Sequence, residues 1–256
     1  MCRLYGQRSA ATAGAAEPLC VSHNALRFQS HVHPHGWGVG WWRAGRPQVE
    51  RGVLPAHADQ AFCDASHRAR SRVVLAHVRD ASVGAVTERN THPFAHGPWL
   101  FAHNGTVARF RRSARVRAAL EAEIAPSLRR NLHGETDSER CFYLFLSRLG
   151  RSWRRATLAE VRRALAETTR IVSGLADPGA ARPSSLNFLV SDGRLLAAAR
   201  RGRTLHLLRQ PGPSGRVVIA SEPIGKGPWR EVPDGGFVGV DPRGRLVEGA
   251  LLPPRP

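Results

Sequence analysis

The sequence predicts an α+β protein whose sheets are mainly antiparallel. Strand-like segments lie near both ends of the chain, and two helix-like segments lie in the middle. Beyond residue 185, short apolar segments alternate with turn residues, a pattern typical of hairpins. The 256 residues can bury a sizeable core. No internal repeat or linker divides them, so we expect a single domain over residues 1–256.

Two segments of the first half are predicted to be strands. "RVVLAHVRD" at 72–80 has β-branched and apolar residues between polar ends. "WLFAHNG" at 99–105 is similar, and we expect it to run into a turn at Asn104-Gly105.

Two helices with recognisable starts follow. "TDSERCFYLFLSRL" begins with Thr136 and Glu139 at capping-box spacing, ahead of an apolar stripe. "TLAEVRRALAETTRIVSG" repeats this device with Thr157 and Glu160. Gly174 is the expected C-terminal stop of the second helix.

The last part of the chain predicts a series of strands. "SLNFLVSDGRLLAAAR" is expected to form a hairpin across Asp192-Gly193. "TLHLLRQ", "RVVIASEP" and "GFVGVDPRGRLVEG" continue the pattern. Between the two halves, the arginine-rich stretch at about 109–131 is expected to be a basic loop or insertion.

The charge of the chain is strongly positive. The formal net charge is +18, and Lys226 is the only lysine among the 38 basic residues. Such a charge suggests a nucleic-acid partner, with "RFRRSARVR" at 109–117 as the densest run. An arginine excess beside many Ala, Gly and Pro residues is explained more simply by the base composition of the genome. We therefore favour a solvated basic surface and do not expect nucleic-acid binding, which stays an alternative.

Membrane segments and a secretion signal are not expected. The apolar share is 42%, and no apolar run approaches the roughly 20 residues of a membrane span. The N-terminus lacks the apolar stretch of a signal peptide. We expect a cytoplasmic protein with no membrane contact.

Three alternating histidines, His31, His33 and His35, precede a glycine-rich segment. In an extended chain they would project to one side, which leaves a zinc site open as an alternative. A polar loop is the favoured interpretation, because Pro34 disturbs a strand and no HExxH motif accompanies them. The glycines that follow lack the spacing of a dinucleotide fingerprint. We expect neither a metal nor a cofactor.

Other polar residues stand at predicted element ends, where sites gather. Asn104 and Gly105 offer a side-chain amide beside an open backbone N–H, the two donors of an oxyanion hole, although a plain Asn-Gly turn fits as well. Arg79 could grip a carboxylate or form a surface ion pair. Asp137 could accept an ammonium group or simply complement a helix start.

Four cysteines stand at positions 2, 20, 63 and 141, without a CxxC motif. Their spacing favours free thiols. Cys141 lies on an apolar helix and is expected in the core. Cys2 follows Met1 directly, so it is a candidate nucleophile. His103, beside Asn104, leaves a Cys–His pair open.

Taken together, these segments resemble the class II glutamine amidotransferases, enzymes with an N-terminal cysteine nucleophile. The similarity is greatest to their stand-alone, single-domain members, such as the γ-glutamyl hydrolase of ergothioneine synthesis. The matching segments span nearly the whole chain in order: "MCRLYG", "HGWGVGWW", "LAHVRDAS", "NTHPF", "WLFAHNGTV", "GETDSE", "SLNFLVSDG" and "VVIASEP". Relatives often have aspartate where this chain has His35.

The resemblance implies a four-layer αββα sandwich around two mainly antiparallel sheets, the N-terminal nucleophile hydrolase type. It also implies a role for each matching residue. The catalytic set is Cys2, freed by loss of Met1, with Asn104 and Gly105 as the oxyanion hole. The substrate-binding set is Arg79 for the α-carboxylate, Asp137 for the α-ammonium, and Ser82, Gly36 and Trp37 around the pocket.

The mechanism expected from this set uses the freed α-amino group of Cys2 as base for its own thiol. The thiolate attacks a γ-amide, and water then cleaves the γ-glutamyl thioester to release glutamate. The substrate is glutamine or a larger γ-glutamyl conjugate, and the sequence leaves this choice open. Ammonia made from glutamine would call for an accepting partner protein. A non-catalytic interaction module of the same fold stays an alternative.

Overall fold

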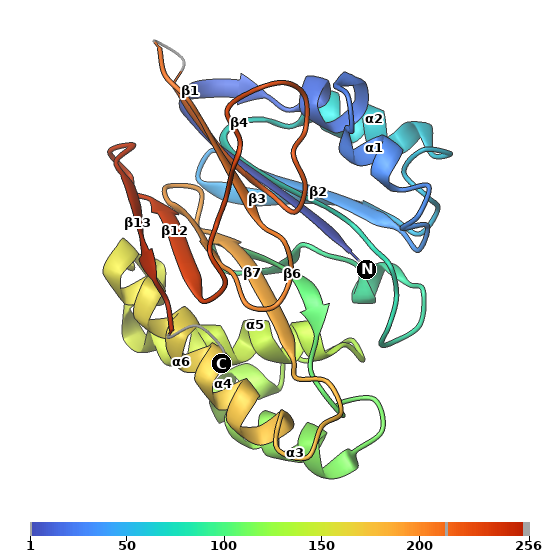
Figure 1. Cartoon of the computed structure of the whole chain (residues 1–256), viewed down its shortest axis with the longest axis vertical. Coiled ribbons are helices and arrows are strands. Elements are labelled where there is room, and N and C mark those ends of the chain that lie inside the picture. The colour runs from blue at the N-terminus through green and yellow to red at the C-terminus, as the bar shows by residue number, and fades with distance from the viewer. Residues whose placement is uncertain (1, 213–214, 253–256) are drawn as a thin grey trace.

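The computed structural model describes residues 2–212 and 215–252, and within them the chain forms four layers. Two sheets lie face to face, and helices cover the outer face of each (Figure 1). Every strand pairing in both sheets is antiparallel. The predicted αββα sandwich is confirmed.

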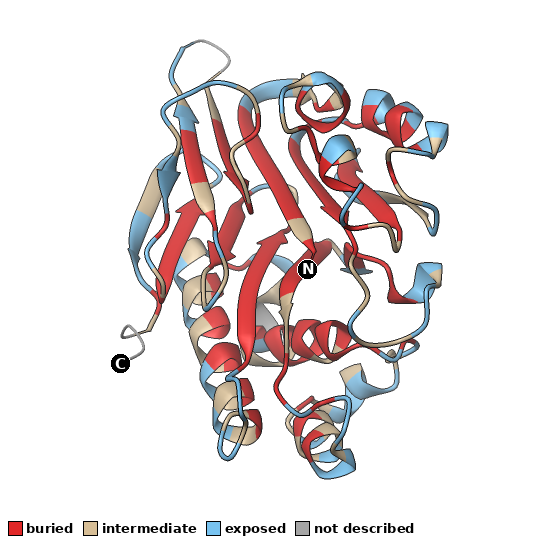
Figure 2. Cartoon of the chain, turned by 45° about the vertical axis from the view of Figure 1, so that its right-hand side comes forward, coloured by how far each residue is buried: buried red, intermediate tan, exposed pale blue. Residues whose placement is uncertain are grey.

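The first sheet has seven strands in the order β11-β9-β10-β1-β4-β2-β3. Its strands are β1 (Arg3–Gly14), β2 (Trp37–Arg43), β3 (Arg46–Gly52), β4 (Arg70–Val78), β9 (His206–Gln210), β10 (Arg216–Ala220) and β11 (Arg230–Glu231). The central strand β1 begins directly after Cys2, and the N-terminus is marked near the middle of the molecule in Figure 2.

The second sheet has six strands in the order β13-β12-β8-β7-β6-β5. Its strands are β5 (Phe94–His96), β6 (Trp99–Thr106), β7 (Ser185–Ser191), β8 (Leu196–Ala199), β12 (Gly236–Val240) and β13 (Leu246–Ala250). The predicted hairpin is confirmed, since β7 and β8 pair across the turn at Asp192-Gly193.

The helices divide between the two outer faces. Those on the first sheet are the turn η1 (Glu17–Val21), α1 (Leu26–Gln29) and α2 (Gln60–Arg68). Those on the second sheet are α3 (Ala114–Ala122), α4 (Pro126–Arg129), α5 (Asp137–Leu149) and α6 (Leu158–Ala176). Two short turns, η2 (Glu88–Asn90) and η3 (Gly150–Arg154), complete the elements.

The predicted helix starts are present. Thr136 caps α5 by accepting the N–H of Glu139, while the Glu139 carboxylate binds the N–H groups of residues 133 and 134 instead of closing the box. Thr157 and Glu160 form a complete capping box on α6. Such a cap stabilises a helix by about 1 kcal/mol.

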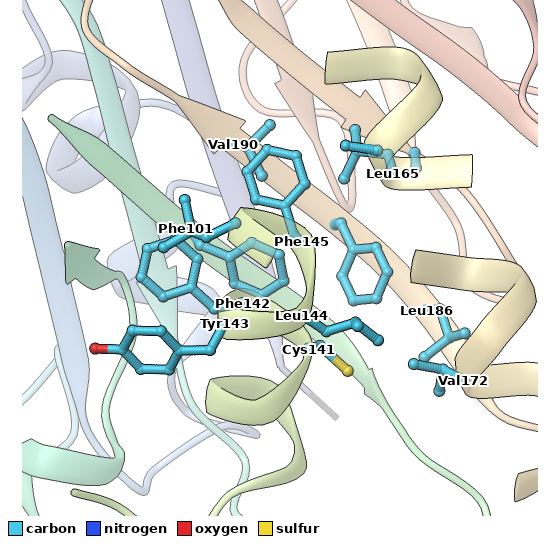
Figure 3. Packing of buried hydrophobic residues seen from close by; sticks show 14 of the residues in the cluster. Phe101, Cys141, Phe142, Tyr143, Leu144, Phe145, Leu165, Val172, Leu186 and Val190 are labelled. Carbon is cyan, nitrogen blue, oxygen red and sulfur yellow. The ribbon is translucent and has the colours of Figure 1, made fainter. Parts of the chain in front are cut away.

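Apolar side chains fill all three spaces between the layers. Leu4, Leu75 and Leu189 belong to the cluster between the sheets. Aromatic rings dominate the cluster beneath α5 and α6, where Phe101 of β6 stacks on Phe142 of α5 at a centroid distance of 5.2 Å (Figure 3). The sheets are therefore buried on both faces, and a polar group inside them needs a specific partner.

Three local predictions differ from the structure. Asn104 and Gly105 do not form a turn, because β6 continues through them and pairs with β7. Gly174 does not end α6, which runs to Ala176. The basic stretch at 109–131 contains α3 and α4, since its apolar residues pack onto the core.

The three alternating histidines do not project to one side. Their segment follows α1 as a series of turns, with the N–H of His31 bonded to Phe28 O and that of His33 to Ser30 O. His31 stacks on His57, His33 is buried, and His35 lies beside Asp80. Within residues 2–212 and 215–252, no cluster of His, Cys, Asp or Glu side chains could hold a metal ion.

The prediction of free thiols is wrong for two of the cysteines. Cys20 on η1 and Cys63 on α2 form a disulfide, with their Cα atoms 6.0 Å apart. They are 43 residues apart in sequence, and only the packing of η1 against α2 brings them together. Cys141 is free and buried among the rings of the core, as expected (Figure 3).

None of the helices in the described part of the chain is long and apolar enough to span a bilayer.

Candidate active site

The Cys2 thiol lies against the backbone that follows β4. The N–H of Asp80 donates to Sγ at 3.3 Å, and Sγ is 3.5 Å from the carbonyl oxygen of the same residue. Burial raises the pKa of the Cys2 thiol, although the Asp80 hydrogen bond and the charge of Arg79 lower it. The thiol therefore needs a base close by before it can attack a substrate.

Strand pairing brings Arg79 to the nucleophile. Arg3 pairs with Val78 across β1 and β4, so residues 2 and 79 leave the sheet side by side. Arg79 is only 2% exposed, and its guanidinium donates to the carbonyl oxygens of residues 83, 84 and 85 at 2.9–3.2 Å. Among the described residues no carboxylate forms an ion pair with it, which removes the surface ion-pair interpretation.

The charge of Arg79 is suited to a carboxylate ligand. Burial lowers its pKa, but a guanidinium stays protonated at neutral pH. Three of its five N–H groups bind the carbonyls just described, and the other two have no acceptor among the described residues, so they can bind a planar anion.

The loop that holds Arg79 is itself fixed. Glu135 accepts the N–H of Ala85 at 3.0 Å and the side-chain amide of Asn90 at 3.2 Å. Asn90 in turn accepts the N–H of Glu135 at 2.9 Å. These bonds tie the loop to the segment before α5, where the next site residue lies.

Asp137 is the first residue of α5 and is only 3% exposed. Its Oδ2 accepts the N–H of Val107 at 2.7 Å, and its Oδ1 accepts the N–H of Ser138 at 2.9 Å. Thr136, rather than Asp137, caps the helix. No described cation forms an ion pair with this carboxylate, so it has lone pairs left for an ammonium group.

Asn104 and Gly105 lie near the end of β6, which runs to Thr106. Asn104 is 2% exposed, and its side-chain amide lies 3.2 Å from the hydroxyl of Ser221. A Cβ at Gly105 would clash with the carbonyl oxygen of Ser185 on β7. The close approach of the two strands therefore requires glycine at this position.

Ser82 and Gly36 lie at the rim of the site. The exposed Ser82 hydroxyl is 3.1 Å from that of Thr106, next to Gly105. Gly36 has φ +111°, a backbone conformation that favours glycine, and its carbonyl accepts the N–H of Arg79 at 2.8 Å.

Trp37, expected at the pocket, has its side chain elsewhere. The ring is buried between β2 and α2, edge-on to Phe62, and its N–H donates to Asp59 at 2.8 Å. The cause is the alternation of side chains along β2, which turns the Trp37 ring toward the helices, and a part for Trp37 in substrate binding stays a prediction. Only its backbone stays near the site.

His103 does not act as the partner of Cys2. Its ring is fully buried, with Nδ1 2.9 Å from the Ser138 hydroxyl and Nε2 3.0 Å from the carbonyl oxygen of Ser185. Both ring nitrogens are thus occupied, and the Cys–His pair left open by the sequence is not formed.

The sequence did not single out two groups that the structure brings to the site. The Asp80 backbone contacts Sγ, and the Ser221 hydroxyl contacts Asn104. Asp80 follows Arg79 in a segment already of interest, and Ser221 lies in "VVIASEP". Their roles depend on contacts between strands, which neither segment reveals alone.

Comparison with known proteins assigns the family. The class II glutamine amidotransferase family matches residues 1–225. The chain is 33% identical over 255 residues to γ-glutamyl-hercynylcysteine sulfoxide hydrolase of Mycobacterium tuberculosis, covering 95% of this chain and 94% of that protein.

Solved structures share the fold over nearly the whole chain. A glutamine aminotransferase class-II domain protein from Silicibacter pomeroyi superposes with a TM-score of 0.69 at 25% identity, covering 98% of this chain and 100% of that one. Glutamine phosphoribosylpyrophosphate amidotransferase of Bacillus subtilis superposes with a TM-score of 0.67 at 15% identity, covering 98% of this chain and 49% of that one. The resemblance inferred from the sequence is confirmed, and the chain belongs to the class II glutamine amidotransferase family.

Proposed function

We propose that the protein hydrolyses γ-glutamyl amides through a thioester on Cys2. The observation that carries this proposal is a pair of buried charged groups, Arg79 next to the thiol and Asp137 within electrostatic reach of Arg79. Arg79 is a buried cation and Asp137 a buried anion, and neither has an ion-pair partner among the described residues. A free α-amino acid head carries the two complementary charges, so it would neutralise both.

The reaction begins at the γ-carbonyl. Loss of Met1 frees the α-amino group of Cys2, which takes the thiol proton as Sγ bonds to the carbonyl carbon. Asn104 and the N–H of Gly105 stabilise the negative oxygen. The tetrahedral intermediate then collapses, the C–N bond breaks, and the same ammonium group gives its proton to the departing amine.

Water completes the cycle. It adds to the γ-glutamyl thioester, with the α-amino group again accepting a proton, and the C–S bond breaks to release glutamate and the thiol. The amine product is free ammonia when the substrate is glutamine. Only in that case does an ammonia-accepting partner protein serve a purpose.

We further propose a γ-glutamyl conjugate, rather than glutamine alone, as the substrate. The Mycobacterium tuberculosis relative is named for hydrolysis of such a conjugate. A pocket of about 540 Å³ opens beside Ser82 and Thr106, with Arg111 and Arg112 among its lining residues. It gives room at the site for a substrate larger than glutamine.

The test is glutamate release by purified protein whose loss of Met1 is verified by intact mass. Substrates are L-glutamine and γ-glutamyl-hercynylcysteine sulfoxide, and Cys2→Ala is the control. Release that disappears in Cys2→Ala supports the proposal, and the ratio of the two kcat/KM values identifies the preferred substrate. Correctly processed protein that releases glutamate from neither compound contradicts it.

A further inference from the structure

Ser221 links the nucleophile strand to the strand of the oxyanion hole. The residue follows β10 directly and is fully buried. Its hydroxyl accepts the N–H of Leu4 at 2.9 Å, and its own N–H donates to the Leu4 carbonyl at 3.0 Å. Ser221 is therefore locked to β1 two residues beyond Cys2. The same hydroxyl lies 3.2 Å from the side-chain amide of Asn104, in the other sheet.

When the NH₂ group of Asn104 faces the Ser221 hydroxyl, that hydroxyl has more hydrogen-bond donors around it than acceptors. The oxygen of Ser221 then receives two donors, from Leu4 and Asn104, and its own proton has no acceptor among the described residues. The carbonyl oxygen Oδ1 of Asn104 is buried and also has no partner within the described chain. Buried polar atoms are rarely left unpaired, because burial without a hydrogen bond is costly.

Rotation of the amide by 180° gives both oxygens a partner and leaves only the NH₂ group unpaired. It exchanges the oxygen and nitrogen of Asn104 and moves no other heavy atom, an exchange that the positions of the two atoms alone do not decide. The Ser221 hydroxyl then donates to Oδ1 of Asn104 while still accepting from Leu4. The NH₂ group of Asn104 becomes a buried donor without an internal acceptor.

We propose that Ser221 is a positioning residue that holds Asn104 in this orientation, with its oxygen on Ser221 and its NH₂ group kept free for the oxyanion. The inference rests on the proposed function, since it assigns Asn104 to the oxyanion hole. The Leu4 N–H fixes the hydroxyl so that its proton can only point away from β1. The strand that carries the nucleophile thereby also orients the group that stabilises the transition state.

Steady-state kinetics tests the inference, because loss of a positioning residue for the oxyanion hole should lower kcat and leave KM nearly unchanged. Removing one oxyanion-hole donor typically lowers kcat by about 10²–10³-fold, so we expect Asn104→Ala to fall in this range. Ser221→Ala should lower kcat by about tenfold or more with KM changed little, because the interaction exists only in the transition state. Ser221→Thr keeps the hydroxyl and should recover most of the rate.

A double-mutant cycle distinguishes positioning from general damage. Ser221→Ala combined with Asn104→Ala should be no slower than Asn104→Ala alone, because Ser221 acts through Asn104. The matched control is Ser66→Ala, which removes another fully buried serine hydroxyl, one that donates to Phe62 O at 2.7 Å on α2. Its kcat should match the wild type. Additive losses in the cycle, or a Ser221→Ala enzyme as fast as the wild type, would overturn the inference.

Neutron diffraction of deuterated Cys2→Ala protein gives a readout independent of activity. The inference predicts that deuterons lie on the Asn104 atom facing away from Ser221. Deuterons on the atom facing Ser221 would refute it, whatever the enzyme does. If wild-type protein cleaves no γ-glutamyl amide, the proposed function fails, and the diffraction result still decides the orientation of Asn104.

Discussion

The Cys2 thiol accepts a hydrogen bond from the backbone N–H of Asp80, with the sulfur 3.3 Å from that nitrogen. This contact exists because β1 and β4 pair in the register Arg3 to Val78, which leaves the next residues of both strands adjacent. The nucleophile is thus positioned by the sheet itself. Burial raises the pKa of its thiol, so its reactivity depends on a base at the same residue.

Arg79→Lys should raise KM for a γ-glutamyl substrate by about 10–100-fold while kcat changes less. An ammonium cannot bind a carboxylate through two parallel hydrogen bonds. The binding energy lost is the part that the ground state and the transition state share, so KM rises more than kcat falls. Steady-state kinetics provides the measurement. Arg170→Lys on α6 is the matched control, because that side chain is exposed away from the site and should leave KM unchanged. An unaltered KM in Arg79→Lys would contradict the role of Arg79.

Gly105→Ala should destabilise the fold by about 1–3 kcal/mol and abolish activity, because the added methyl group would clash with Ser185 O. Gly174→Ala is the control within α6, where an added Cβ meets nothing within 4 Å. That change should stabilise the protein by about 0.5–1 kcal/mol. Chemical denaturation measures both. Equal effects of the two substitutions would argue against the close approach of β6 and β7.

Stability should fall as the pH drops below about 6.5, because buried histidines must stay neutral in the folded protein. Burial, with the charge of Arg79 as a smaller contribution, lowers the pKa of His77 from 6.5 to about 3. Between these two values the unfolded chain binds a proton that the folded one excludes. The contribution of one such histidine to stability is therefore fully present above pH 6.5 and falls by roughly 1.4 kcal/mol per pH unit below it.

His77→Phe should flatten this dependence between pH 6 and 4, as measured by urea denaturation at several pH values. The ring of His92 lies 4.2 Å from that of His77 and is also fully buried, so part of the slope should persist. His67→Phe, on an exposed position of α2, is the control. If His67→Phe reduces the slope as much as His77→Phe does, the pH dependence does not come from the buried His77.

Opening the disulfide between Cys20 and Cys63 should lower the free energy of unfolding by about 2–4 kcal/mol, because the bond closes a long loop. The measurement compares wild type with a Cys20→Ala, Cys63→Ala variant, with and without reductant. Reductant should lower the melting temperature of the wild type but not that of the double variant. A Cys141→Ala protein, which keeps the disulfide, should respond to reductant as the wild type does.

The sequence was most informative where a residue's role depends on its own segment. Thr157 and Glu160 have the spacing of a capping box and so indicate the start of a helix, and Asp192-Gly193 indicates a hairpin. Both signals depend only on neighbouring residues. The candidate site was recognisable because Cys2 and its expected partners stand in separate short motifs that follow one another in a familiar order. Their assigned roles, the single domain and a cytoplasmic location stay predictions.

The rest depended on tertiary contacts. Which face of β2 carries Trp37 is set by packing against α2, and a one-residue change of register would reverse it. Cys20 meets Cys63 only because η1 lies on α2. Ser221 reaches Asn104 across two sheets, so no spacing in the sequence could reveal that contact.

The most direct test of nucleophilic catalysis by Cys2 is a search for the acyl-enzyme. Protein is mixed with substrate, quenched with acid during turnover, digested and analysed by mass spectrometry. We expect an N-terminal peptide that begins with Cys2 and carries one γ-glutamyl group, and we expect this peptide to be absent from Cys2→Ala protein. Turnover by protein that retains Met1, or an adduct on any residue other than Cys2, would contradict it.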